Sequence, residues 1–307
     1  MYDMNLLDTT KFYKDCTLCP RNCHADRYTL ANGYCRMSAE LSVAKIYKHM
    51  WEEPCITGEG GSGTVFFSGC NLCCLFCQNS KISHENKGFV MTASVLSESF
   101  LELQEKKASN INLVTGVCHI PLIVNALIMA KKGGLTIPVV YNSSGYESVS
   151  SLKLLDGLID IYMPDFKYMS EELSLKYSKA ADYPEIAKKA IAEMYSQTGP
   201  AVMGDDGLMK KGVLVRHLVL PDSVPDSKKV LRYLKETYGN NIIISIMNQY
   251  TPVGSVKDHP VLGRKVTEDE YSRVVEFADK IGIEKGFVQE GEAVSESFIP
   301  NWDLVED

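Results

Sequence analysis

Four cysteines, Cys70, Cys73, Cys74 and Cys77, fall within eight residues of one another. The apolar run 64–67 stands just before them and is typical of a buried strand, and Ser-Gly at 68–69 breaks it. We therefore expect the cysteines on a loop at the carboxyl end of a strand, where α/β folds place their chemistry. Thiolates this close suit an iron–sulfur cluster better than disulfides, whose geometry is hard to satisfy between near neighbours.

Two sets of three ligands fit this loop. Cys70, Cys74 and Cys77 give the spacing C-x3-C-x2-C with Phe76 before the last cysteine, and using Cys73 in place of Cys74 gives C-x2-C-x3-C. A cubane cluster normally takes four thiolates, so three leave one iron open, and an open metal position marks a catalytic site. A structural zinc knuckle is the alternative use of the same residues.

The C-x3-C-x2-C spacing, Phe76 and the preceding strand resemble the cluster loop of the radical S-adenosylmethionine (radical SAM) enzymes. The resemblance implies that Cys70, Cys74 and Cys77 hold a [4Fe–4S] cluster whose open iron binds S-adenosylmethionine. In that family the reduced cluster cleaves the cofactor to a 5′-deoxyadenosyl radical, which abstracts hydrogen from the substrate. The cofactor supplies the chemistry, and the protein binds, orients and excludes water.

A second group of cysteines lies near the start of the chain. Cys16, Cys19, Cys23 and Cys35 follow the spacing C-x2-C-x3-C-x11-C in a hydrophilic stretch. Four thiolates are a full set for a closed zinc site or for a second iron–sulfur cluster, and the spacing does not decide between them. We predict a structural or electron-relaying metal site.

The composition is that of an ordinary globular protein, with 307 residues of which 45% are hydrophobic. A formal charge of −7 argues against a nucleic-acid partner bound through its phosphates. No apolar run is long enough to span a bilayer, and the first residues do not form a signal peptide, so we expect a cytoplasmic protein without a membrane partner. Ten cysteines in a reducing compartment indicate metal or redox chemistry.

Six apolar segments alternate with helical segments along the chain and are predicted to be strands: 64–67, 111–114, 137–141, 159–163, 213–220 and 242–247. This alternation predicts an α/β fold with a parallel sheet. It does not decide between an open sheet and a barrel, although no G-x-G-x-x-G follows the first strand, as a Rossmann sheet would require. The radical SAM resemblance implies a partial (β/α)6 barrel.

We divide the chain into three parts. Residues 1–58 form a Cys-rich metal-binding module, 59–254 the radical SAM partial barrel, and 255–307 a C-terminal helix and tail that cover the barrel. A capping box at 267–270 predicts a helix to about residue 280. A strand carrying Gln289 is expected at the open side of the barrel, and the aromatic tail is expected to pack.

The strand ends should carry the cofactor contacts, because the carboxyl ends of parallel strands converge on one face. Asp165 and Lys167 resemble the Asp-x-Lys element of activating enzymes of glycyl-radical systems. The resemblance implies that Asp165 accepts a hydrogen bond from the amine or ribose of S-adenosylmethionine and that Lys167 pairs with its carboxylate. Further cofactor contacts are implied at two other strand ends: Asn142, Ser143, Gln249 and Tyr250.

Two other strand positions bear on the site. Thr115-Gly116-Val117 stands where radical SAM enzymes usually carry Gly-Gly-Glu, so backbone carbonyls or Asp165 would have to take over the amine contact, and His119 is a candidate contact nearby. Arg216 and His217 are neighbours on one strand and must point to opposite faces, so only one is expected to reach the site.

Longer segments, such as 215–221, resemble a poorly characterised group of pyruvate formate-lyase activating enzyme-like radical SAM proteins. The resemblance implies a glycyl-radical-enzyme activase, or a radical SAM enzyme that acts on a small molecule or a peptide side chain. A low-potential electron donor of the flavodoxin or ferredoxin type is the implied partner, joined by a glycyl-radical enzyme in the first case. A non-catalytic iron–sulfur electron-transfer protein is the rival class.

Overall fold

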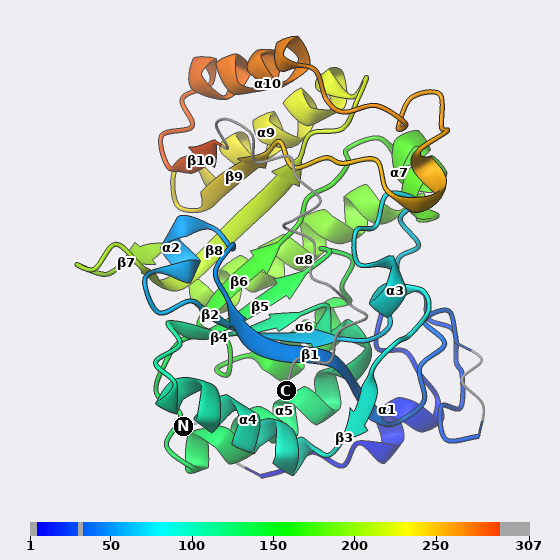
Figure 1. Ribbon diagram of the computed structural model, residues 1–307, viewed down its shortest axis with the longest axis vertical. Coiled ribbons are helices and arrows are strands. Elements are labelled where there is room, and N and C mark those ends of the chain that lie inside the picture. Colours follow the sequence, from blue (N-terminus) through cyan, green and yellow to red (C-terminus); the bar gives the residue numbers. More distant parts are fainter. Residues whose placement is uncertain (1–4, 30–32, 289–307) are drawn as a thin grey trace.

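The computed structural model describes residues 5–29 and 33–288 of the chain. One sheet organises it, in the order β10-β9-β8-β6-β5-β4-β2-β1-β3, with β7 paired to β8 (Figure 1). The strands are β1 (Leu41–His49), β2 (Ser62–Phe67), β3 (Phe89–Met91), β4 (Asn110–Val114), β5 (Val139–Ser143), β6 (Ile161–Pro164), β7 (Val202–Met203), β8 (Met209–Leu218), β9 (Ile243–Met247) and β10 (Gly286–Val288).

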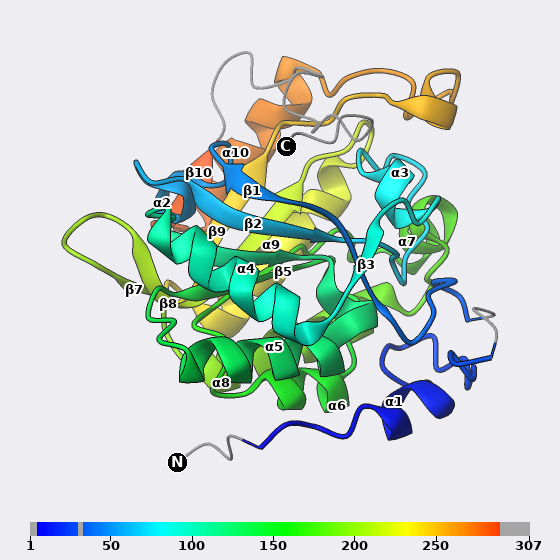
Figure 2. The ribbon, with the colours of Figure 1, turned by 60° about the horizontal axis from the view of Figure 1, so that its bottom comes forward.

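The six predicted strands are confirmed as β2, β4, β5, β6, β8 and β9, which pair in this order and in parallel. β10 continues the parallel series beyond β9, and β1 adds an antiparallel strand beside β2. Within residues 5–29 and 33–288, no pairing joins β10 to β3, so the curved sheet stays open (Figures 1 and 2). This is the partial barrel that the resemblance implied.

The helices connect the strands, and most of them cover the outer face of the sheet (Figures 1 and 2). They are α1 (Thr10–Lys14), α2 (Pro54–Thr57), α3 (Ser80–Ser83), α4 (Ala93–Glu105), α5 (Ile120–Lys132), α6 (Val149–Leu152), α7 (Glu171–Ser178), α8 (Tyr183–Thr198), α9 (Val224–Tyr238) and α10 (Glu268–Lys280). Local signals fix several ends. The Thr92 hydroxyl accepts a hydrogen bond from the Val95 amide, and Thr267 and Glu270 form the predicted capping box.

The inner face of the sheet is filled at one end by α2, which the sequence did not predict. Cys55 and Ile56 of α2 pack with inward side chains of the strands, among them Val140, Ile161 and Leu214. Cys55 is 3% exposed, which is typical of a small buried residue rather than a ligand. The hairpin that leads from β1 through α2 to β2 therefore closes the floor of the barrel.

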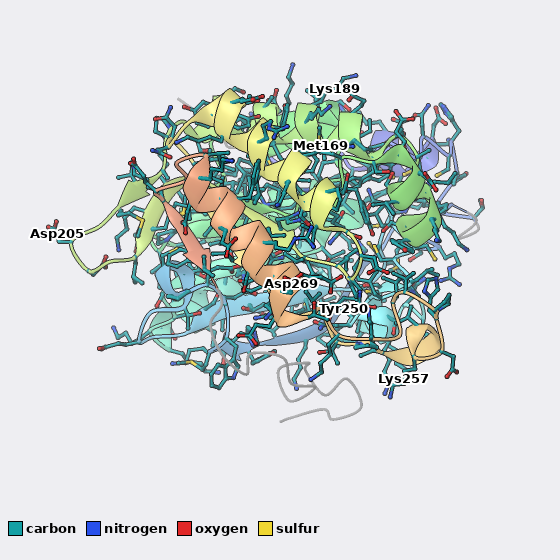
Figure 3. The ribbon with its side chains drawn as sticks, turned by 90° about the horizontal axis from the view of Figure 1, so that it is seen from above. Met169, Lys189, Asp205, Tyr250, Lys257 and Asp269 are labelled. Atoms are coloured by element: carbon teal, nitrogen blue, oxygen red, sulfur yellow. The ribbon has the colours of Figure 1, made fainter. Side chains whose placement is uncertain are left out.

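The C-terminal helix α10 lies against α9 (Figures 1 and 3). The Tyr271 hydroxyl donates to the Ile246 carbonyl oxygen at 2.7 Å, which ties α10 to the last strand of the barrel. β10 is the predicted strand at the open side, although Gln289 and the aromatic tail lie outside the described residues. Among the described helices, none has the length and apolar character needed to cross a bilayer.

Candidate cluster and cofactor site

The cysteine loop follows β2, at the carboxyl end of the parallel strands as predicted. Gly69 turns the chain into the loop with φ of +80°, and a Cβ there would lie 2.4 Å from Met37, so glycine is required for both reasons. All four cysteines are free thiols, and Cys74 is buried. Gly69 thus fixes the start of the loop, and the four sulfurs are not used in disulfides and could bind metal.

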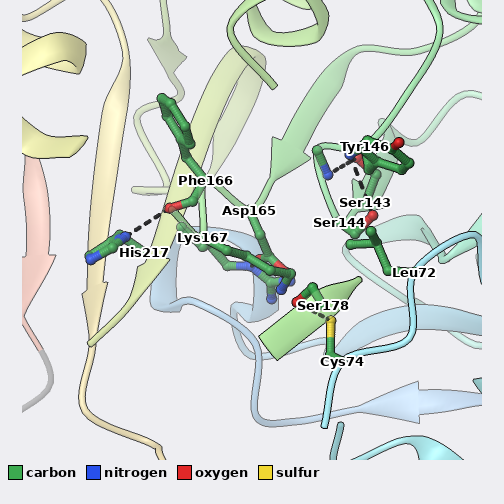
Figure 4. Close-up of polar contacts among 12 residues, drawn as sticks. Leu72, Cys74, Ser143, Ser144, Tyr146, Asp165, Phe166, Lys167, Ser178 and His217 are labelled. Atoms are coloured by element: carbon green, nitrogen blue, oxygen red, sulfur yellow. Dashed lines mark hydrogen bonds and ion pairs between the residues drawn. The ribbon is translucent and has the colours of Figure 1, made fainter. Parts of the chain in front are cut away.

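Hydrogen-bond donors reach two of the three sulfurs that the resemblance names. The Leu72 amide donates to Cys70 Sγ at 3.4 Å, and the Ser178 hydroxyl donates to Cys74 Sγ at 3.0 Å (Figure 4). At Cys77, the Ser83 hydroxyl and the Asn79 amide oppose the rise of the thiol pKa that burial causes. Such donors stabilise metal-bound thiolates and tune the metal. Because Cys74 is buried and bonded to Ser178, the structure favours it over Cys73 as the ligand.

Burial raises the pKa of the Cys70, Cys74 and Cys77 thiols, for Cys77 to about 11. The thiols are therefore protonated near neutral pH without metal, and metal binding must release their protons. Across the described ranges, no three Cys, His, Asp or Glu side chains are grouped so that they could hold a metal ion. Ligation would thus also require the three thiols to turn toward one centre.

Space for a cluster lies on both sides of the loop. One cavity of about 230 Å³ is lined by Cys73, Cys74 and Cys77 together with the segment at Val253 and Gly254. A second cavity of about 280 Å³ lies on the side of the N-terminal module and includes Cys70 in its lining. Free thiols, their donors and adjacent space fit a [4Fe–4S] cluster, and the ligand roles stay a prediction.

The predicted Asp-x-Lys element lies beside the loop and forms a compact ionic network (Figure 4). Lys167 Nζ lies 2.6 Å from Asp165 Oδ2, and Arg216 Nε donates to Asp165 Oδ1 at 3.0 Å. Although burial acts to raise it, the pKa of Asp165 is lowered by the charges of Lys167 and Arg216. Asp165 is therefore an anion at neutral pH, and Lys167 is a nearby cation on the cysteine side.

Of the two neighbours on β8, Arg216 faces the interior, which confirms that only one reaches the site. His217 faces the other way, where its Nδ1 donates to the Phe166 carbonyl oxygen at 2.7 Å. Burial lowers the pKa of His217 to about 4, so it is neutral and serves to hold the end of β6. Arg216 instead keeps Asp165 in place.

Asn142 and Ser143 were both expected at the cofactor, but the structure separates them. Asn142 Oδ1 accepts from Arg216 Nη2 at 2.7 Å and so joins the ionic network in the interior. The Ser143 hydroxyl accepts from the Gly145 amide at 3.2 Å and holds the turn that follows β5 (Figure 4). Consecutive strand residues point to opposite faces, which explains the difference.

At the sixth strand, Gln249 and Tyr250 lie close to the cysteine loop. The Gln249 carbonyl oxygen accepts from Gln78 Nε2 at 3.2 Å. The Tyr250 ring packs edge-on against Phe76 at 6.0 Å, and its hydroxyl donates to the Leu262 carbonyl oxygen at 2.6 Å. Both residues therefore fix the loop from the far edge of the barrel, and their predicted contacts with the cofactor stay a prediction.

The second strand end provides no carboxylate, as the sequence indicated. Thr115 adopts a left-handed conformation with φ of 61°, and its amide donates to the Asn142 carbonyl oxygen at 2.9 Å. His119 is completely buried, its Nε2 donates to the Ser68 carbonyl oxygen at 3.0 Å, and burial lowers its pKa to about 3. His119 thus stabilises the start of the cysteine loop through Ser68. Because its side chain is buried, this structural role accounts for it better than the expected contact with substrate or cofactor.

Two tyrosines and a serine that sequence reasoning did not single out hold the site together. The Tyr183 hydroxyl accepts from the Lys167 amide at 2.9 Å and lies 2.8 Å from the Ser144 carbonyl oxygen. The Tyr168 hydroxyl lies 2.9 Å from the Ser178 hydroxyl, which in turn bonds Cys74. Several of these contacts join residues that are far apart in the sequence, so no local sequence pattern predicts them.

The N-terminal module docks directly on the cysteine loop through Arg21. Arg21 Nε donates to the Asn71 carbonyl oxygen at 2.8 Å, and Nη1 donates to the Lys179 carbonyl oxygen at 2.7 Å. The guanidinium also stacks on the Tyr34 ring at 3.8 Å. In the sequence, Arg21 stands between Cys19 and Cys23, two predicted ligands of the module. Its contacts therefore connect the N-terminal group of cysteines to the cysteine loop.

Comparison with known proteins bears on this geometry. Residues 56–178 match the model of a family described as 4Fe-4S single cluster domain, a span that holds the cysteine loop, the Asp165–Lys167 pair and Ser178. This span of the chain is therefore similar to a 4Fe-4S single cluster domain. The match supports the predicted [4Fe–4S] cofactor, and the matched span begins within α2.

Other similarities extend beyond residues 56–178. The uncharacterized protein MJ0674 of Methanocaldococcus jannaschii is 28% identical over 294 residues, which cover 91% of this chain and 80% of that protein. A domain of pyruvate-formate lyase-activating enzyme from Bacteroides vulgatus matches with a TM-score of 0.41 and 11% identity over 56% of this chain and 92% of its own. Native anSMEcpe with bound AdoMet matches with a TM-score of 0.48 and 13% identity, over 72% of this chain and 61% of its own.

Proposed function

We propose that this protein is a radical SAM enzyme that reductively cleaves S-adenosylmethionine and uses the 5′-deoxyadenosyl radical to abstract hydrogen from a substrate. In this proposal Cys70, Cys74 and Cys77 hold the [4Fe–4S] cluster. Bound there, the cluster would supply the electron for cleavage of the cofactor. The observation that carries the proposal is the position of the Asp165–Lys167 pair beside three thiols on one loop, two of which accept hydrogen bonds.

The charges of this pair suit the methionyl end of S-adenosylmethionine. Lys167 offers an ammonium for the carboxylate, and Asp165 offers an anionic acceptor for the amine. Arg216 remains bonded to Asp165 and Asn142 behind them, so Asp165 stays charged when Lys167 turns to a ligand. The protein contribution in this proposal is to bind and orient the cofactor and to exclude water from it.

The proposal is tested by anaerobic reconstitution with iron and sulfide, reduction with dithionite and detection of 5′-deoxyadenosine from S-adenosylmethionine. Cys74→Ala and Cys73→Ala form a matched pair, since they remove neighbouring sulfurs from the same loop. We expect Cys74→Ala to lose the cluster and the product, and Cys73→Ala to keep both. A fully loaded wild-type protein that forms no 5′-deoxyadenosine would disprove the function.

The substrate and the partners belong to the same proposal. We infer a low-potential flavodoxin- or ferredoxin-type donor, because the cluster must be reduced before each cleavage. A glycyl-radical enzyme is one acceptor of the radical, and a small molecule or a peptide side chain is the other. Incubation with a candidate glycyl-radical enzyme, read out as a glycyl radical in its EPR spectrum, separates the two.

A further inference from the structure

Cys118, from the end of the second barrel strand, lies against the cysteines of the N-terminal module. It belongs to the short 3-10 helix Gly116–His119 that follows β4 and is 4% exposed. It forms a buried cluster with Met37 and Val117, and Cys19 and Cys35 of the N-terminal module pack against this cluster. The spacing of the N-terminal cysteines could not reveal this neighbour, because Cys118 comes from another part of the chain.

A buried positive charge stands next to these thiols. Arg27 is 2% exposed, and its Nη1 donates to the Cys118 carbonyl oxygen at 2.7 Å and lies 4.0 Å from Cys16 Sγ. Its side chain also contacts the carbonyl oxygens of Met37 and Ser38 and the ring of Tyr13. All of these partners are neutral, whereas a buried charge is normally compensated by an opposite one. We therefore expect an anionic group among the neighbouring sulfurs, which would compensate the buried positive charge of Arg27.

Four thiolates on a metal provide such an anion. A zinc ion with four thiolates carries a net charge of −2, and a [4Fe–4S]²⁺ cluster with four thiolates has the same charge. Sulfurs on one tetrahedral zinc are about 3.8 Å apart, given a Zn–S bond of about 2.3 Å. Cys19 and Cys35 both pack against the buried cluster that contains Cys118, so thiols from two distant segments lie in one region.

Cys23, a predicted ligand, is placed less favourably. Its residue is exposed, and its Sγ lies 3.9 Å from the Cys16 carbonyl oxygen and against Gly33. Cys16, Cys19 and Cys35 are instead buried or partly buried on the side that faces the barrel. Cys23 is thus the most exposed of the four predicted ligands, although its sulfur lies near Cys16.

We propose that Cys118 is a thiolate ligand of the N-terminal metal centre, with Cys16, Cys19 and Cys35, in place of Cys23. The centre then takes zinc or an iron–sulfur cluster, since either accepts four thiolates. The sulfurs must turn inward and lose their protons on binding, because none of the described side chains forms a ready ligand group. The centre would fasten the N-terminal module to the second strand of the barrel, and this inference does not depend on the proposed radical chemistry.

The test uses the full chain in which Cys70, Cys74 and Cys77 are changed to Ala, so that the metal found belongs to the N-terminal centre. The protein is purified without oxygen and loaded with zinc in one arm and with iron and sulfide in the other. Metal per chain is measured after a chelator wash, and X-ray absorption gives the number of sulfur ligands. The two arms show which metal the centre keeps.

Three further substitutions are compared in this background: Cys118→Ser, Cys23→Ser, and Cys55→Ser as a buried control outside the cluster. We expect Cys118→Ser to lose the metal or one sulfur ligand, and the other two to keep the metal with four sulfurs. Unchanged binding by Cys118→Ser, or loss of metal by Cys23→Ser, would overturn the assignment. If Cys118→Ser does not fold, Cys23→Ser alone decides, because four sulfurs in that variant require a ligand beyond Cys16, Cys19 and Cys35.

Discussion

Replacing Ser178 with Ala should lower the reduction potential of the barrel cluster. The Ser178 hydroxyl donates to Cys74 Sγ at 3.0 Å and is itself bonded to the Tyr168 hydroxyl. A hydrogen bond to a cluster sulfur stabilises the reduced state, which is more negative, more than the oxidised state. Its removal therefore makes reduction harder, provided that Cys74 is a ligand.

The size of the effect follows from the strength of one hydrogen bond. A neutral hydrogen bond contributes about 0.5–1.5 kcal/mol net. For a one-electron couple about 1.4 kcal/mol corresponds to 59 mV, so we expect a decrease of about 20–60 mV. The shift should be in the potential and not in the cluster content, because Ser178 is not a ligand in this scheme.

The potential is measured by EPR during a reductive titration of the reconstituted protein. Ser174→Ala is the matched control, since Ser174 is buried in the same helix and its hydroxyl bonds to the Glu171 carbonyl oxygen at 3.0 Å. We expect that control to keep the wild-type potential. An unchanged potential in Ser178→Ala with a full cluster would show that Cys74 is not a ligand and would favour Cys73.

Three more predictions concern the supports of the site. Tyr183→Phe leaves the Lys167 amide unpaired at a cost of about 1–3 kcal/mol, so the melting temperature should fall by about 2–5 °C in a calorimetric scan. Because the pKa of His217 is lowered from 6.5 to about 4, the unfolded chain binds the proton more readily. The free energy of unfolding should therefore decrease as the pH falls from about 6.5 to 4, and denaturant titrations of His217→Gln should show a smaller decrease. Arg21→Ala removes two hydrogen bonds to the cysteine loop and the Lys179 region, so the cluster absorbance should be lost faster in air than in Lys11→Ala, and equal rates would contradict this role.

Much of the fold could be predicted because its signals are local. The six strands are short apolar runs, and the caps at Thr92 and Thr267 depend on residues within one helical turn. The antiparallel strand β1 is not among these six, and its pairing with β2 at the edge of the barrel was not predicted. The helix α2 and its position on the inner face of the sheet were not predicted, because only four residues are helical. Their burial depends on strands that come much later in the chain.

The site was predictable where residue type and spacing carry the chemistry. The cysteine loop, Asp165 and Lys167 meet at the strand ends as expected. Alternation along β5 would have shown that Asn142 and Ser143 cannot both face the interior. The contacts of Tyr183 and Cys118 could not have been predicted, because each joins segments that only the complete fold brings together.

The hairpin that closes the barrel floor also bears on how the chain folds. Arg216 Nη1 lies 3.5 Å from Glu52 Oε2, and these two residues are 164 positions apart. Contacts over such a separation form slowly, because a long loop must close before they are gained. The hairpin precedes β8 in the chain and is synthesised first. Its residues can therefore become buried only after β8 has been synthesised. A fragment that begins at residue 59 would lack β1 and α2, and we would expect it to expose the inner face of the sheet and to aggregate.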